Sequence, residues 1–171
     1  MMKILWIVNN ILPDVAKALH IRHGVSGGWL YDLSQRIAEY DEVELAVATY
    51  YSGTEFQDIR VGNIRYFLLP GGSRKMMFYS TAIERHWHTV EQAFPADIVH
   101  LHGTEYVHGL AYLNAFPHKR SVLTIQGIIT RIAEEFLGGL SWAECLRYRT
   151  PSENIKFNGI LENHLLLKRN A

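Results

Sequence analysis

The chain has 171 residues, of which 48% are hydrophobic and 20% are charged. This composition is typical of globular domains and excludes a largely disordered chain, while the length predicts a single domain at roughly 150 residues per domain. Seventeen basic residues balance seventeen acidic ones, so the surplus of positive charge that is typical of nucleic-acid-binding proteins is missing. The single cysteine, Cys145, and the lack of an apolar run long enough to span a bilayer predict a reduced, cytoplasmic location.

Short apolar segments rich in Val, Ile and Leu predict the strands. Most of them are nearly continuous instead of alternating with polar residues, as in parallel strands that are buried on both faces. A further short piece over 58–64, turned by Gly62-Asn63, predicts a small hairpin or edge element. The five main segments are Ile4–Val8, Val43–Thr49, Ile64–Leu69, Ile98–Leu101 and Val122–Ile125.

Helical periodicity separates most of these strands. Apolar residues recur at helical spacing from Leu30 to Ala38, from Ile83 to Phe94 ahead of Pro95, and over a shorter stretch from Tyr106 to Leu113. The order β-α-β-β-α-β-α-β predicts an α/β fold with a doubly wound, mostly parallel, Rossmann-like sheet.

The character of the sequence changes after the fifth strand. Residues 130–171 contain no convincing strand, and Ser152 is a candidate N-cap for a helix over 152–169. A strand is the expected next element in such an alternating fold. We therefore expect residues 1–171 to form one domain that stops before its last strand, within a longer protein. The apolar stripe of the predicted helix is Phe157, Ile160, Leu161 and Leu165.

The connection between Asn9 and Gly28 is far longer than the 2–6 residues usual in a βα unit. It ends in Gly27-Gly28 where a helix begins, an arrangement that suits a phosphate or another anion, although a simple flexible turn is an equal alternative. No G-x-G-x-x-G follows the first strand and no G-x-x-x-x-G-K-[ST] occurs. The sequence thus argues against a dinucleotide dehydrogenase and a P-loop NTPase.

Two histidines mark the fourth of the main strands. His100 and His102 share one face of the strand, and no further ligand at suitable spacing completes a metal site, so no metal is expected. His102 comes at the carboxyl end, where α/β sheets bind ligands, which makes it a candidate acid, base or hydrogen-bonding group, with a core or capping histidine as the alternative. His100 is interpreted as structural. Gln126-Gly127 closes the next strand at the same edge, so the loops carrying Gly28, His102 and Gln126 are expected to converge.

Basic and apolar residues alternate with aromatics over 71–79. Such a segment can contact a membrane surface or a lipid-linked acceptor, and the alternative is an exposed loop entering a helix. The candidate contact residues are Arg74, Lys75, Met76 and Phe78. No D-x-D pair is present to anchor a nucleotide through a divalent metal.

Four segments together resemble the N-terminal domain of family 4 glycosyltransferases, enzymes of the GT-B architecture with two facing Rossmann-like domains. They are KILWIVNNILP, SGGWLYDLSQRIAE, DIVHLHGTEY and SVLTIQG, in this order. The resemblance covers residues 3–130, and the helix predicted over 152–169 matches the helix that precedes the last strand of that domain.

The resemblance implies a retaining, metal-independent glycosyltransferase that moves a sugar from a nucleotide sugar to a glycan or lipid-linked acceptor, with no cofactor besides this donor. The N-terminal domain would hold the acceptor, and Gly27 and Gly28 would approach the donor diphosphate. Most donor contacts would come from a C-terminal domain, so this segment alone is expected to be inactive. Many members end the fifth strand with a histidine where this chain has Gln126, which leaves His102 and Glu105 as the candidate catalytic residues.

Elementary chemistry agrees with these roles. Backbone N–H groups at a helix start would stabilise the departing diphosphate, and Arg131 could add positive potential. Neutral groups such as Asn9, Asn10 and Gln126 suit sugar hydroxyls, with Gly127 permitting a sharp turn. The full protein is expected in the cytoplasm, with possible peripheral contact at the inner face of the membrane. The alternative hypothesis is a Rossmann-like ligand-binding or interaction module without chemistry of its own.

Overall fold

A computed structural model describes residues 1–21, 28–156 and 159–170. The chain divides into two compact units, Met1–Ile125 and Gln126–Ala171, where the sequence predicted a single domain. Each unit is described by itself below.

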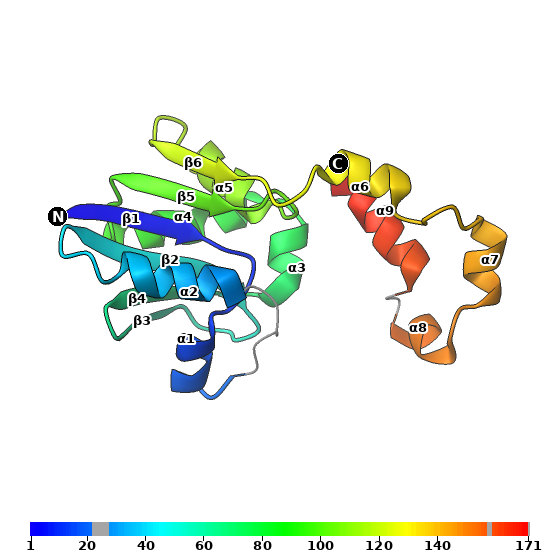
Figure 1. Cartoon of the computed structure of the whole chain (residues 1–171), viewed down its shortest axis with the longest axis horizontal. Helices are drawn as coiled ribbons and strands as arrows, with labels where there is room; N and C mark the ends of the chain where they lie inside the picture. The colour runs from blue at the N-terminus through cyan, green and yellow to red at the C-terminus, as the bar shows by residue number, and fades with distance from the viewer. Residues whose placement is uncertain (22–27, 157–158, 171) are drawn as a thin grey trace. The chain divides into compact units, whose positions relative to one another are not determined.

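The first unit is built on a six-stranded sheet in the order β3-β4-β2-β1-β5-β6 (Figure 1). Every neighbouring pair is parallel except β3 with β4. The parallel strands thus follow the order of a Rossmann-like sheet, with the reversal of winding between β1 and β5. The strands are β1 (Met2–Ile7), β2 (Val43–Tyr51), β3 (Gln57–Val61), β4 (Ile64–Pro70), β5 (Ile98–His102) and β6 (Ser121–Thr124). The predicted α/β class, the five main strands and the hairpin are confirmed.

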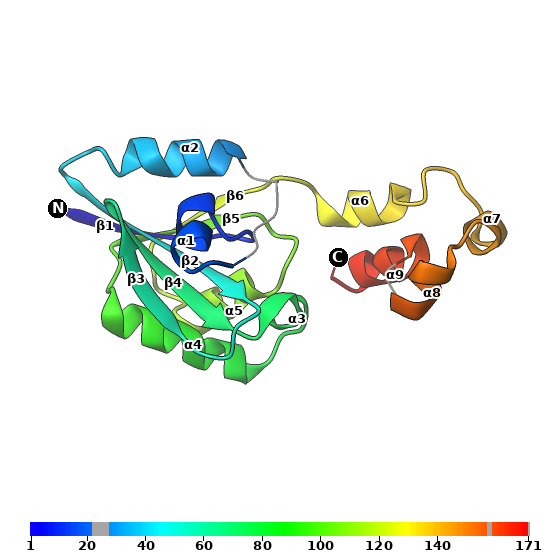
Figure 2. The same cartoon turned by 90° about the horizontal axis from the view of Figure 1, so that it is seen from below.

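Helices cover both faces of this sheet (Figure 2). Alternation along β1 sends Leu5 and Ile7 into one core with α3, α4 and α5, and Trp6 and Val8 into a second core with α1 and α2. Trp87, on α4, is fully buried in the first core. The helices are α1 (Pro13–Ala18), α2 (Gly28–Ile37), α3 (Gly72–Met77), α4 (Thr81–Ala93) and α5 (His108–Ala115).

Helix α1 corrects the prediction of a connection without structure between Asn9 and Gly28. Pro13 lies in the first turn, where its missing N–H costs no hydrogen bond, and Val15 and Ala16 are buried against the sheet. Six residues give fewer than two full turns, too few for a helical period to stand out in the sequence. Helix α5 also begins two residues later than the predicted Tyr106.

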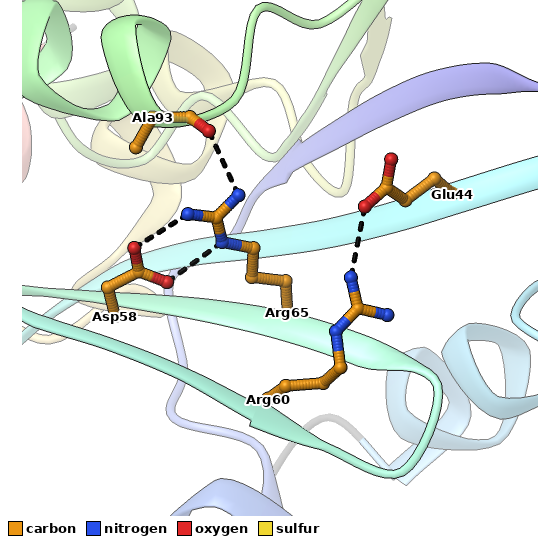
Figure 3. A network of polar contacts seen from close by, with 5 residues as sticks. All are labelled: Glu44, Asp58, Arg60, Arg65 and Ala93. Carbon is orange, nitrogen blue, oxygen red and sulfur yellow. Dashed lines mark hydrogen bonds and ion pairs between the residues drawn. The ribbon is translucent and has the colours of Figure 1, made fainter.

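An arginine on β4 ties the β3–β4 hairpin to α4 (Figure 3). The guanidinium of Arg65 donates two hydrogen bonds to the carboxylate of Asp58 on β3, at 2.8 and 2.7 Å, and one to the carbonyl of Ala93 at the end of α4, at 2.9 Å. The bidentate contact raises the pKa of Arg65. Beside it, Arg60 pairs with Glu44 at 3.0 Å. These contacts anchor the antiparallel edge of the sheet.

The described residues of the second unit contain helices and no strand, as predicted for the region after residue 130. The sequence prediction of one helix over 152–169 capped by Ser152 is wrong, because the structure has separate helices α8 and α9. Thr150 is the residue that forms a capping box, reciprocally bonded with Glu153, and Ser152 lies inside the first turn. Of the predicted stripe, Phe157 is outside the described residues. The helices are α6 (Ile129–Glu135), α7 (Trp142–Arg147), α8 (Pro151–Lys156) and α9 (Ile160–Asn170).

Candidate functional site

The carboxyl ends of β1 and β5 lie side by side at the point where the winding of the sheet reverses. Open α/β sheets bind their ligands at this position, because the chains leaving the two strands turn away from each other and open a crevice. The chain leaving β1 supplies Asn9 and Asn10, and the chain leaving β5 supplies Gly103 and Glu105. We call Asn9, Gly103 and Glu105 the switch-point group.

A hydrogen bond joins the two loops of this group. The side-chain amide of Asn9 donates to the carboxylate of Glu105 at 2.8 Å, across 96 positions of sequence. Both side chains are half-buried, so the pair is held in place and yet remains accessible. The arrangement fixes a carboxylate and an amide oxygen together at the sheet edge, where each retains acceptor capacity for a ligand hydroxyl.

Gly103 makes this contact possible. Its φ of +98° lies in a region that side-chain-bearing residues rarely adopt. A Cβ at this position would lie 2.1 Å from Oε2 of Glu105 and 2.9 Å from Nδ2 of Asn9, while its own N–H donates to the carbonyl of Thr124 at 2.9 Å. The sequence analysis did not single out this glycine, although its position directly after the strand end was a signal for it.

His102 ends β5 as predicted, but its side chain is buried, with 2% of its surface exposed. The imidazole packs against His100 and Trp6, with ring centroids 3.8 and 4.4 Å away, and Trp29 lies at 6.0 Å. Burial, assisted by His100, lowers the pKa of His102 to about 3, so the ring is neutral at physiological pH. Neither ring nitrogen has a hydrogen-bond partner within the described part of the chain. This environment fits the alternative of a core histidine, and a catalytic role for His102 stays a prediction.

His100 has the structural role expected of it. Its Nε2 lies 2.6 Å from the hydroxyl oxygen of Thr124 on the neighbouring strand β6, and burial lowers its pKa. The imidazole thus links two parallel strands through side chains that face the same side of the sheet.

His108 is a residue that the sequence analysis missed. It begins α5, is 2% exposed, and its Nε2 lies 3.4 Å from the carbonyl oxygen of Val8 at the end of β1. Burial lowers its pKa to about 4. Its own carbonyl accepts a hydrogen bond from the indole of Trp87 at 2.9 Å. These contacts tie the start of α5 to the chain just after β1 and to Trp87 of α4, and no sequence motif marked this residue.

Only one of the two glycines expected to approach the donor diphosphate lies among the described residues. Gly27 lies outside the described residues, and Gly28 is the first residue of α2. A Cβ on Gly28 would meet no atom of the described residues within 4 Å. The indole of the next residue, Trp29, is half exposed, and its ring centroid lies 6.0 Å from that of His102. The predicted approach of a diphosphate to this helix start stays a prediction.

Gln126, Gly127 and Arg131 belong to the second unit. A Cβ on Gly127 would lie 2.6 Å from Cδ1 of Ile132, and Arg131 is exposed and paired with Glu134 at 2.7 Å. Because the units are described separately, the predicted convergence of these residues with Gly28 and His102 stays a prediction.

The segment predicted to contact a membrane forms α3. Met76 is 7% exposed and packs into the core, so this side chain is not available for a surface contact. Lys75 is half-buried and Phe78 is 37% exposed, whereas the side chain of Arg74 lies outside the described part. Within the described ranges, no helix is long and apolar enough to cross a bilayer. Those ranges also hold no group of three or more His, Cys, Asp or Glu side chains that could bind a metal ion.

No protein-family model and no curated protein matches the sequence. The geometry of the sheet edge is therefore the basis for any functional conclusion.

Proposed function

We propose that the first unit is the acceptor-binding domain of a retaining, metal-independent GT-B glycosyltransferase. The observation that carries the proposal is the bonded pair of Asn9 and Glu105 at the switch point. It combines a carboxylate and an amide, both of which hydrogen-bond well to sugar hydroxyls, at the position where this class of sheet binds ligands.

In this proposal Glu105 accepts a hydrogen bond from a hydroxyl of the acceptor sugar. Asn9 holds the carboxylate in one orientation through its Nδ2 and keeps its Oδ1 for a second hydroxyl. The half-exposed indole of Trp29 offers an apolar face on which a sugar ring can rest. Together these groups would orient the acceptor, and positioning of this kind lowers the barrier to transfer.

The donor side of the proposal relies on helix α2. Its ten residues begin at Gly28, and the N–H groups of its first turn, which have no partner within the helix itself, carry partial positive charge. A leaving nucleoside diphosphate gains negative charge during transfer and would be stabilised there. The remaining donor contacts would come from a second domain of the GT-B architecture.

A second candidate, a Rossmann-like binding module without chemistry, is favoured by one observation. His102 is buried and neutral, so Glu105 is the sole titratable side chain that the described switch-point group offers to a ligand. Both functions require sugar or ligand binding at the same edge, and they differ in whether transfer follows. Turnover of a nucleotide sugar by the full-length protein would distinguish the enzyme from the module.

The variant Glu105→Gln tests the acceptor site. Glutamine keeps an oxygen to accept the hydrogen bond from Asn9 but removes the charge, so the fold should be retained while hydrogen bonds to sugar hydroxyls weaken. Since hydrogen bonds to charged groups contribute about 1.5–3 kcal/mol, we expect about tenfold weaker binding of a glycan acceptor in a calorimetric or NMR titration. Glu39→Gln, an exposed acid on the chain after α2, is the matched control and should bind like the wild type. Equal affinities for both variants would contradict the proposal.

A further inference from the structure

A hollow opens at the same edge of the sheet as the switch-point group, at the ends of β2 and β4. It has a volume of about 580 Å³ and is lined by two turns, 52–54 and 70–72, together with Lys75 of α3 and His86 of α4. Tyr51 pairs with Pro70 in the parallel register of β2 and β4, so both turns leave the sheet at the same level. Figure 1 shows α3 at the end of the sheet toward which the parallel strands point.

Glycines form much of the wall. The N–H of Gly71 donates to the carbonyl of Gly53 at 3.3 Å, which joins the two turns. A Cβ on Gly53 would lie 2.2 Å from the ring of Tyr51, and Gly71 has a φ of +118°, so neither position accommodates a side chain. The ring of Tyr51 lies against Gly53 and the stem of Lys75 lies against Gly71, so the two glycines let these side chains pack closely on the turns.

The side chains that line the hollow are cationic or neutral. Lys75 forms no ion pair with any described residue, and no acidic side chain is among the described residues that line the hollow. The Nδ1 of His86 lies 3.0 Å from the hydroxyl oxygen of Tyr50, which leaves Nε2 for a ligand. Burial, together with the positive charges of Lys75 and Arg85, lowers the pKa of His86 and favours its neutral form, so Lys75 supplies the positive charge of the described lining.

We propose that this hollow binds a phosphate group, either as the free ion or as part of a small-molecule phosphate ester. The ammonium group of Lys75, the imidazole of His86 in the tautomer that carries its proton on Nε2, and the hydroxyls of Ser52 and Thr54 supply several hydrogen-bond donors around one concave space. A phosphate group has enough acceptor oxygens to use them, whereas a carboxylate has two. The proposal does not rest on the acceptor-binding function, because none of the residues lining this hollow belongs to the switch-point group.

The experiment is an NMR titration of the whole chain with inorganic phosphate, glucose 1-phosphate and acetate. We expect saturable shifts of the amides of Gly53 and Gly71 and of the His86 ring with both phosphates, and weaker binding of acetate. Tighter binding of glucose 1-phosphate would identify an organic phosphate as the ligand, and equal binding of the two phosphates would identify the free ion. Either result supports a phosphate site. The absence of saturable shifts, or equally tight binding of acetate, would overturn the proposal.

Lys75→Met completes the test. Methionine keeps an unbranched apolar stem of similar length beside Gly71 and removes the charge, so the fold should be preserved and phosphate affinity should fall about tenfold or more. Lys75→Arg should retain most of the affinity. Lys17→Met, an exposed lysine on α1, is the control and should bind phosphate like the wild type. Unchanged affinity in Lys75→Met would also overturn the proposal.

Discussion

Gly103→Ala is expected to abolish glycan binding and to lower the free energy of unfolding by about 1–3 kcal/mol, the usual cost of a strained backbone conformation. The methyl group would occupy the place of the Glu105 carboxylate, 2.1 Å away, and force it off Asn9. Because the glutamate side chain can swing aside, the loss of stability should come from the φ of +98° and the loss of binding from the broken pair. Urea unfolding and a glycan titration on the same variant measure the two effects.

Gly62→Ala is the control for this variant. Gly62 also has a positive φ, +58°, but an added Cβ would meet nothing within 4 Å in the described structure. We expect it to cost about 1 kcal/mol of stability and to leave glycan binding unchanged. Glycan binding by Gly103→Ala at the wild-type level would show that the bonded pair is not part of the binding site.

His102→Leu is expected to stabilise the protein by about 1–3 kcal/mol, the cost of a buried polar group without a partner. Leucine fills a similar volume between Trp6 and His100 and has no ring nitrogens that lack a hydrogen-bond partner. Thermal unfolding should show a rise of roughly 2–4 °C per kcal/mol for a chain of this length. His118→Leu, at an exposed histidine, should leave the transition unchanged. A loss of stability in His102→Leu would show that the imidazole is hydrogen-bonded in solution.

The same histidine makes stability depend on pH in a defined direction. The unfolded chain takes up a proton near the ordinary histidine pKa of 6.5, but folded His102 takes it up only at about 3. Stability is therefore highest above pH 6.5 and falls as the pH decreases toward 3, by up to about 1.4 kcal/mol per pH unit for this one group. His108, with a pKa of about 4, adds to this decrease in stability in the wild type and in the His102→Leu variant alike. His102→Leu should thus lose stability less steeply than the wild type on acidification.

Much of the fold could be predicted because its physical signal is local. The apolar runs of β1, β2 and β4 identified strands buried on both faces, and the alternation with helices indicated the Rossmann-like sheet. Helix α1 was missed because six residues give no recognisable period. The cap at Thr150 was assigned two residues too late, since Ser152 and Thr150 both have the required hydroxyl and only the backbone geometry decides between them.

The candidate site was predictable in its members and not in its contacts. His102 was identified from its place at a strand end, Asn9 as a neutral group suited to sugar hydroxyls, and Glu105 from the family resemblance. Their burial and bonding depend on β1 and β5 being neighbours, which brings Trp6 beside His100 in register and leaves His102 covered. The hollow beside Lys75 was not predictable for the same reason, because it forms between two turns that are distant in sequence.

The most direct test of the acceptor-binding proposal is to map glycan binding on the wild-type chain. A ¹⁵N-labelled sample would be titrated with a panel of neutral oligosaccharides, and shifts would be followed at every assigned amide. The proposal predicts that at least one glycan shifts the amides of Asn9, Gly103 and Glu105 in a saturable manner. Saturable shifts confined to other parts of the chain, or no shifts at these three amides with any glycan, would contradict it.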